Sequence, residues 1–126
     1  MKVLIADDHR PIREIIKKLL IKLQFNTNIY ECEDGEEAVK IYNEEKPDLI
    51  LMDIIMKKSD GFSAIRRIRL ISPEATIIVI SQLPEQEYRQ EALDAGAVDY
   101  LNKENLILLP EMIENIFNSS SKNFIN

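Results

Sequence analysis

KVLIADD, the stretch at residues 2–8, runs from four consecutive apolar side chains directly into two aspartates. An apolar run of this length without polar alternation is typical of a strand that is covered on both faces. Such strands belong to parallel sheets, in which helices pack above and below. Asp7 and Asp8 are therefore expected just past the C-terminal end of a central strand.

The same pattern recurs further along the chain. DLILMD at residues 48–53 is a second apolar run closed by a carboxylate, Asp53, and Lys103 lies just past a third candidate strand. The C-terminal ends of parallel strands emerge on one edge of the sheet, where open α/β folds bind their ligands. We therefore expect Asp53 and Lys103 to converge with the Asp7–Asp8 pair.

Three carboxylates gathered at one edge would repel one another unless a cation joined them. Carboxylate oxygens suit a hard divalent cation, Mg²⁺ or Mn²⁺, better than zinc. The expected convergence therefore predicts a magnesium-type site.

The composition fits a single globular domain, with 126 residues, 45% of them hydrophobic, and a formal net charge of -6. The negative charge argues against direct binding of DNA or RNA. The apolar run after Met1 is too short for a signal peptide or a membrane span, so we expect a cytoplasmic protein without membrane association. Cys32 is the single cysteine, and the single histidine, His9, is interpreted as a loop residue rather than as a base or ligand.

Apolar runs alternate with amphipathic stretches five times, which is the pattern of a doubly wound parallel α/β sheet. The second run is the most polar and is expected at an edge of the sheet. The expected strands are residues 2–6, 27–31, 49–53, 76–81 and 98–101.

Capping residues and prolines mark the expected helices between these strands. We expect the folded domain to span residues 1–118 and residues 119–126 to form a disordered tail. The helix starts are marked by Pro11, Asp34 with Glu37, Asp60, Pro84 and Pro110, and Gly96 marks the end of the fourth helix.

Five separated signals stand at strand ends in the order of one known family. Several concordant motifs are more specific than any single one. From Lys2 to about Phe117 the chain resembles the receiver domain of bacterial two-component response regulators, in particular a stand-alone, chemotaxis-type receiver. The resemblance implies a flavodoxin-like sheet of five parallel strands, in the order 2-1-3-4-5, with five helices. The signals are Asp7–Asp8, Asp53, Ser81, Tyr100 and Lys103, and Ile54-Ile55-Met56 followed by Asp60-Gly61 fits the loop after the third strand.

The resemblance assigns chemical roles to three of these residues. Asp53 corresponds to the phosphoacceptor, which takes a phosphoryl group from a histidine kinase or a histidine phosphotransfer protein. Ser81 would bond one phosphoryl oxygen and Lys103 would pair with another. Phosphoryl transfer needs an in-line nucleophile and cations around the equatorial oxygens, which explains these residue types.

The resemblance also assigns the ligands of Mg²⁺ or Mn²⁺. Asp8, the side chain of Asp53 and the backbone carbonyl of Ile55 would bind the ion directly, and Asp7 would contact it through water. A carboxylate nucleophile gives an acyl phosphate, which is labile enough to serve as a timed signal.

The family further implies a conformational switch. Ser81 would move toward the phosphoryl group and Tyr100 would turn inward, which would remodel the face formed by the fourth helix, the fifth strand and the fifth helix. No output domain is expected, so the signal would pass to an unidentified downstream protein, or the phosphoryl group would be relayed. A phosphorylation-dependent homodimer is also compatible with the family. The chain would catalyse its own phosphorylation and dephosphorylation without being a multiple-turnover enzyme on external substrates.

Three features depart from the family pattern. Lys57 stands where most receivers have proline, which is expected to leave the loop after Asp53 less restrained. Gln82 follows Ser81 where a small residue is usual, and is expected to crowd the phosphoryl group or to hydrogen-bond to it. The fifth helix is expected to start late, after the Leu106–Leu109 cluster, which is read as core packing with part of it a candidate partner surface.

Two bulky apolar residues are expected to flank the path of the water that hydrolyses the acyl phosphate. Ile55 lies two positions after Asp53, and Leu83 lies two positions after Ser81. Aliphatic side chains exclude water that polar ones would orient, so hydrolysis is expected to be slow for the family.

Three other classes share parts of this pattern. An aspartyl-phosphate hydrolase would place its nucleophile at the end of the first strand with a second aspartate two positions later, whereas here Asp7 and Asp8 are adjacent. A flavin-binding module would need hydroxyl and glycine residues after the first strand to cradle a phosphate. A phosphorylation-independent interaction module would not need the full set of active-site residue types.

Overall fold

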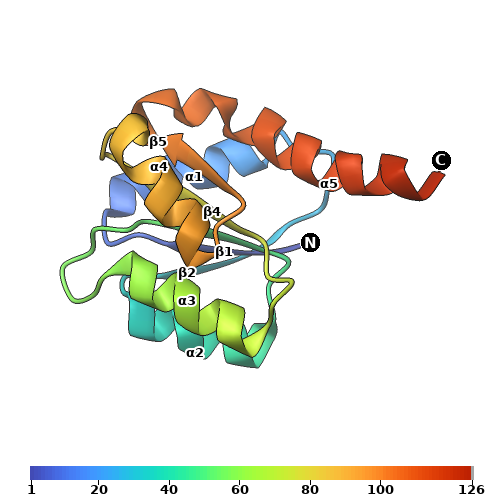
Figure 1. Ribbon diagram of the computed structural model, residues 1–126. Coiled ribbons are helices and arrows are strands. Elements are labelled where there is room, and N and C mark those ends of the chain that lie inside the picture. The colour runs from blue at the N-terminus through green and yellow to red at the C-terminus, as the bar shows by residue number, and fades with distance from the viewer. Residues whose placement is uncertain (126) are drawn as a thin grey trace.

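The chain alternates strands and helices along its length (Figure 1). The computed structural model describes the backbone of residues 1–125 and the side chains of residues 1–118. None of the helices within this part is long and apolar enough to cross a membrane. The strands are β1 (Lys2–Ala6), β2 (Asn28–Cys32), β3 (Leu49–Met52), β4 (Ile77–Ser81) and β5 (Asp99–Asn102). The helices are α1 (Arg10–Leu20), α2 (Gly35–Glu45), α3 (Gly61–Ile71), α4 (Glu85–Ala95) and α5 (Leu109–Ile125), with a short 3-10 helix, η1 (Lys103–Leu108), before α5.

The five strands form one parallel sheet in the order β2-β1-β3-β4-β5. This order confirms the predicted flavodoxin-like fold, and the polar strand β2 lies at an edge as expected. Consecutive strands are added on opposite sides of β1, which makes the C-terminal ends of β1 and β3 the switch point of the sheet. In open α/β sheets the ligand crevice lies at this point.

The helices form two layers around the sheet, with α2, α3 and α4 on one face and α1 and α5 on the other (Figure 1). Alternate residues of each strand face opposite layers. In β1, Leu4 packs in the core under α2 and α3, whereas Val3 and Ile5 pack in the core under α1 and α5. Because both faces are covered, every residue of β3 and β4 is buried.

Four strands differ by one residue, at one end or at both, from those predicted. The flanking residues still pair with their neighbours: the Asp53 N–H donates to the Ala6 carbonyl at 2.9 Å, and the Val98 N–H donates to the Ile77 carbonyl at 2.7 Å. The differences therefore concern where the regular ladder stops rather than which strands pair. Strand β2 spans 28–32 instead of 27–31, β5 spans 99–102 instead of 98–101, β3 ends at Met52 instead of Asp53, and β4 begins at Ile77 instead of Thr76.

The fifth helix starts differently from the prediction. Residues 103–108 form η1 instead of an irregular segment, and α5 begins at Leu109, one residue before Pro110. Leu106 and Leu109 are buried, whereas Ile107 is 76% exposed and Leu108 is 49% exposed. The apolar cluster is thus divided between core and surface.

Helix α5 extends to Ile125 and so covers most of the segment that was expected to be a disordered tail. The side chains of residues 119–126 and the backbone of Asn126 lie outside the described part of the chain. The domain boundary after residue 118 remains a prediction.

Gly61, the first residue of α3, lets this helix approach the end of β3. A β-carbon at this position would overlap the backbone carbonyl oxygen of Asp53 and would meet the Ile54 Cα at 2.6 Å. The Gly61 N–H donates to the Ile54 carbonyl at 3.1 Å. Only glycine leaves room for this close approach, which fixes the backbone next to Asp53.

Candidate functional site

The predicted convergence occurs at the C-terminal edge of the sheet. Ligand atoms from Asp7, Asp8, His9 and Asp53 all lie within 4.8 Å of one another. Asp7 is 2% exposed and Asp53 is 3% exposed, so the carboxylates are held away from bulk water. Burial of like charges at this density requires compensating cations.

Lys103 provides one such cation from the end of β5. Its Nζ atom lies 2.9 Å from Asp7 Oδ2 and 3.1 Å from Asp53 Oδ2, and its side chain is only 6% exposed. Burial works to lower the pKa of Lys103, but the bonds to Asp7 and Asp53 outweigh it and raise this pKa above its ordinary value. Lys103 is therefore a permanent charge that bridges two carboxylates.

The pKa of the Asp53 carboxylate is raised above its ordinary value. Burial raises its pKa, the neighbouring Asp7 raises it further, and Lys103 opposes the rise. Its Oδ1 atom accepts a hydrogen bond from the Ile55 N–H at 3.2 Å, while Oδ2 faces Lys103. The carboxylate is thus held at both oxygens in one orientation.

Asp8 contains the atom that best indicates a cation site. Its Oδ2 atom accepts a hydrogen bond from the Lys57 N–H at 2.9 Å, but among the described side chains no hydrogen bond reaches the buried Oδ1 atom. His9 Nδ1 lies 3.0 Å from Oδ1 without the alignment of a hydrogen bond. A buried carboxylate oxygen left in this way fits a hard cation, so the donor set is compatible with Mg²⁺ or Mn²⁺.

Lys57 makes one contact to the site that proline could not make, while its expected effect on the restraint of the loop stays a prediction. A proline at this position would have no N–H to donate to Asp8. The loop is closed further by an isolated bridge between Ile55 and Asp60. The departure from proline therefore supplies a hydrogen bond to the site. The assignment of the Ile55 carbonyl as a ligand remains a prediction.

Two residues of the site were not assigned by sequence reasoning. His9 donates its backbone N–H to Asp7 Oδ1 at 2.8 Å, and its half-exposed ring lies against Asp7 and Asp8. Arg13, which is buried in α1, donates from Nη1 to the Asp7 carbonyl at 2.7 Å and from Nε to Glu31 Oε1 at 2.9 Å. His9 could have been assigned to the site because it follows Asp7 and Asp8 in the sequence. No sequence pattern distinguishes Arg13, which lies among apolar positions of a helix.

The two predicted switch residues meet at a third residue. Ser81 is buried, and its Oγ atom accepts a hydrogen bond from the Leu83 N–H at 3.1 Å. The Tyr100 hydroxyl donates to the Leu83 carbonyl at 2.6 Å, and Asn102 Nδ2 donates to the same carbonyl at 3.0 Å. Tyr100 is 1% exposed, and burial raises its pKa. Its ring therefore already occupies an inward position in this structure.

A small cavity of about 70 Å³ opens above Asp53. This volume suits a group of phosphoryl size rather than a larger substrate. All residues expected to control access are present in its wall, including Gln82, which is exposed at the rim. The cavity is lined by His9, Asp53, Ile55, Ser81, Gln82, Leu83 and Lys103.

Comparisons with known proteins agree with this geometry. The CheY chemotaxis protein of Bacillus subtilis is 39% identical over 102 residues, which cover 81% of this chain and 84% of the relative. The CheY of Thermotoga maritima is 40% identical over 102 residues, with the same coverage. The response regulator domain of Thermotoga maritima CheB is 33% identical, covers 94% of each chain and has a TM-score of 0.79.

A further similar structure is the CheX–CheY–BeF₃–Mg²⁺ complex from Borrelia burgdorferi, with a TM-score of 0.84 and 27% identity over 93% of this chain and 89% of that chain. The family model of the response regulator receiver domain matches residues 3–114, nearly the whole described fold. With its parallel sheet, its cluster of aspartates and this match, the chain belongs to the family of response regulator receiver domains.

Proposed function

We propose that the chain accepts a phosphoryl group on Asp53 from a histidine kinase or a histidine phosphotransfer protein and signals by a conformational change to a partner protein. The observation that carries this proposal is the position of Asp53: a buried carboxylate at the base of a cavity of phosphoryl size, between Lys103 and Ser81. We also propose that the chain catalyses its own phosphorylation and dephosphorylation and does not turn over external substrates; the position of Lys103 and Ser81 beside Asp53 supports this.

The side chains around Asp53 divide the work of the transfer. An Asp53 oxygen attacks phosphorus, the new P–O bond forms, and the bond to the donor nitrogen breaks with its electron pair left on the imidazole. Lys103 is close enough to stabilise the negative charge that develops on the phosphoryl oxygens, and the Ser81 hydroxyl is a further hydrogen-bond donor. Because these groups are already in place, they reorganise little during the reaction.

The proposed metal ligands are Asp8, Asp53 and the Ile55 carbonyl, with Asp7 acting through water. A bound Mg²⁺ or Mn²⁺ would supply positive charge for the phosphoryl oxygens. The unsatisfied Oδ1 atom of Asp8 supports this assignment.

Magnesium should raise the melting temperature of the wild-type protein. An ion at ten times its dissociation constant adds about 1.4 kcal/mol, which for a domain of this size is a shift of several degrees. Asp8→Asn should melt higher than wild type in chelator, because one repelling charge is lost, and should gain much less from magnesium. Thermal melts of both proteins with and without the ion decide this. Equal magnesium shifts in the two proteins would contradict the metal assignment.

The lifetime of the acyl phosphate should depend on two cavity residues. Ile55 and Leu83 both line the cavity above Asp53, which supports the proposal that polar side chains there would orient water toward the phosphoryl group. The double variant Ile55→Asn, Leu83→Gln should lose its phosphoryl group about tenfold faster than wild type. The decay is followed by intact mass after removal of the donor. An unchanged rate of dephosphorylation would contradict the role of Ile55 and Leu83. The rate in Gln82→Ala would then test whether Gln82 controls the access of water.

The switch would act through Leu83. The Leu83 N–H is bonded to Ser81 and its carbonyl is bonded to Tyr100, so a movement of Ser81 toward a phosphoryl group would displace both contacts. Tyr100 lies in β5, next to α4 and α5. This route connects the cavity to the face that these elements form.

The test of the proposed function is direct phosphorylation. Incubation with a small acyl phosphate and magnesium should raise the intact mass of the protein by one phosphoryl group, and omission of magnesium should prevent the change. Transfer from a panel of phosphorylated histidine kinases would then identify the donor class. A protein whose mass does not change with any donor is not a phosphoacceptor.

A further inference from the structure

His9 is the N-cap residue of α1 and directly follows the two aspartates. The residues preferred at an N-cap have side chains that accept a hydrogen bond from the first turn of the helix, but the His9 side chain makes no such bond. Its ring faces the carboxylates instead: Nδ1 lies 3.2 Å from Asp7 Oδ1 and 3.0 Å from Asp8 Oδ1. The ring therefore belongs to the aspartate cluster and not to the helix cap.

The Asp8 side chain is only 8% exposed, yet its Oδ1 atom has no hydrogen-bond partner among the described side chains. Buried carboxylate oxygens normally have such a partner. The other oxygen, Oδ2, accepts a hydrogen bond from the Lys57 N–H. A cation that binds both Asp8 Oδ1 and His9 Nδ1 would satisfy the one buried oxygen that the protein leaves without a donor.

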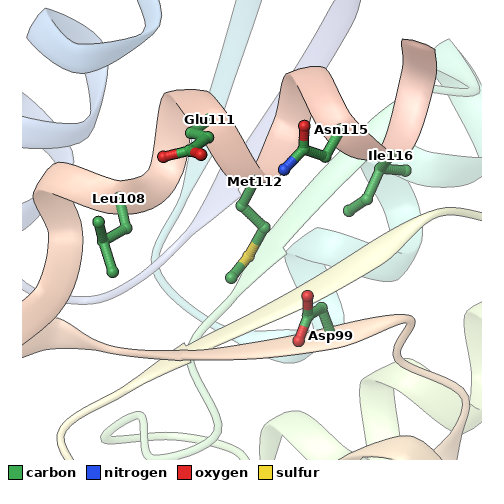
Figure 2. Close-up of a pocket in the computed structure, with 6 residues that line it drawn as sticks. All are labelled: Asp99, Leu108, Glu111, Met112, Asn115 and Ile116. Atoms are coloured by element: carbon green, nitrogen blue, oxygen red, sulfur yellow. The ribbon is translucent and has the colours of Figure 1, made fainter. Parts of the chain in front are cut away.

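Asp99, at the start of β5, is a carboxylate with no such need. It points toward α5 in an apolar groove of about 430 Å³ (Figure 2). Its Oδ1 atom accepts hydrogen bonds from Arg89 Nη1 at 2.7 Å and from the Tyr100 N–H at 2.8 Å. The charge of this side chain is therefore met within the chain. The contrast places the need for a bound cation at Asp8.

The spacing of the atoms around Asp8 suits ligands of one metal ion. Two ligand atoms that bind an ion at right angles, each at about 2.1 Å, lie about 3 Å apart. The distances from His9 Nδ1 to the two carboxylate oxygens, 3.0 and 3.2 Å, agree with this value. Ligand atoms of Asp7, Asp8, His9 and Asp53 all lie within 4.8 Å of one another. A neutral imidazole with its proton on Nε2 can bind a metal through Nδ1.

We propose that His9 adds a nitrogen ligand to the cation site, through Nδ1, so that the site takes a borderline transition-metal ion such as Ni²⁺ or Zn²⁺ in preference to Mg²⁺. Imidazole suits these ions, whereas Mg²⁺ is a hard cation that prefers oxygen ligands. The proposal rests on the proposed function, because it shares the ligands Asp8 and Asp53 with the proposed magnesium site. It adds a ligand that discriminates between ions.

The His9 ring also lines the cavity above Asp53. An ion held by His9 and Asp8 would therefore lie next to the carboxylate that is proposed to accept the phosphoryl group. Transition-metal ions would then compete with Mg²⁺ for the same position. The identity of the bound ion thus becomes a variable of the phosphoacceptor site.

Isothermal titration of untagged protein with Ni²⁺ alone and with Mg²⁺ alone tests this selectivity. His9→Gln has a side chain of similar length without an imidazole, so it should weaken Ni²⁺ binding about tenfold more than it weakens Mg²⁺ binding. Asp8→Asn removes a ligand that both ions share and should weaken both in similar proportion. Arg10→Gln, at the next position and exposed, should change the ratio of the two affinities by less than about twofold. Melting temperatures in chelator verify that each variant is folded.

Electron paramagnetic resonance of the complex with one equivalent of Cu²⁺ identifies the ligand directly. His9 is the single histidine of the 126 residues, so coupling to a remote ring nitrogen can come only from its imidazole. The N-terminal amine has no remote ring nitrogen and cannot produce this signal. The coupling should be present in the wild-type protein and absent in His9→Gln. A merely structural role of His9 would produce no such coupling.

Two results would overturn the proposal. Equal weakening of Ni²⁺ and Mg²⁺ binding by His9→Gln would show that the ring does not discriminate between ions, and a wild-type Cu²⁺ complex without ring-nitrogen coupling would show that Nδ1 is not a ligand. Binding of Mg²⁺ together with either result would reject His9 and retain the magnesium assignment. Binding of neither ion by the wild-type protein would reject the metal assignment itself, and phosphorylation of Asp53 is tested separately by intact mass.

Discussion

Asp53→Asn should remove phosphorylation completely. In the wild-type protein a small acyl phosphate and magnesium should add one phosphoryl group, and in the variant the intact mass should stay unchanged. The amide nitrogen and oxygen of asparagine fill the same space but do not provide a carboxylate nucleophile. Asp7 is not placed to replace it, because the cavity that would admit the phosphoryl group is lined by Asp53 and not by Asp7.

Asp60→Asn is the matched control for this result. Asp60 lies in the same loop and caps α3, with its side chain accepting a hydrogen bond from the Phe62 N–H at 2.8 Å. Asparagine caps helices as well as aspartate does, so the fold should be retained. Asp60→Asn should be phosphorylated as fully as wild type. Equal modification of Asp53→Asn and wild type would show that another residue is the acceptor.

Lys103→Met should destabilise the protein more than any other single substitution considered for this site. The Lys103 Nζ atom lies 2.9 Å from Asp7 Oδ2 and 3.1 Å from Asp53 Oδ2. Its removal leaves both buried carboxylates without this ion pair. Loss of one partner of a buried ion pair costs about 3 kcal/mol, on the order of 10 °C in Tm. Thermal melts in chelator measure the effect, and Lys40→Met, at an exposed position of α2, should change Tm by much less.

Two further measurements test the origin of this loss. Adding Asp53→Asn to Lys103→Met should recover part of the stability, because fewer buried charges then lack a partner. Lowering the pH should also recover part of the stability of Lys103→Met. Since the pKa of Asp53 is raised in the folded state, the fold binds its proton more readily than the unfolded chain does, so the Asp53 contribution to stability improves as pH falls through the folded pKa. A Lys103→Met protein as stable as wild type near neutral pH would contradict the ion-pair account.

The fold could be predicted from the sequence because its signals are strong and local. Apolar runs without polar alternation, such as residues 49–52, fit strands that are covered on both faces. Asp34 marks the start of α2 because its side chain accepts a hydrogen bond from the Glu37 N–H, and Gly96 marks the end of α4 because its φ is positive. The start of α5 was less predictable. Residues 103–108 wind into a 3-10 helix because Leu106 and Leu109 are drawn into the core, which is a tertiary effect.

The site was predictable only in part. Aspartates that follow apolar strands converge by topology alone, so Asp7, Asp8 and Asp53 could be placed together before the structure was known. The roles of His9 and Arg13 depend on how α1 leaves β1, which no sequence pattern specifies. The hydrogen bond from the Lys57 N–H to Asp8 was not predicted, because the comparison with proline considered the rigidity of the ring and not the N–H that proline lacks.

If the proposed switch works through Tyr100, the inward position of this side chain sets how large a response the switch can give. Phosphorylation that shifts a conformational equilibrium can raise the fraction of molecules with Tyr100 inward only to one. The signal can therefore increase at most by the reciprocal of the fraction that is inward before phosphorylation. In this structure the hydroxyl is bonded to the Leu83 carbonyl at 2.6 Å, and the ring is fully enclosed. A receiver that rests in this state would have a high basal output and a narrow dynamic range, and it would act as a graded modulator of its partner rather than as an on–off relay.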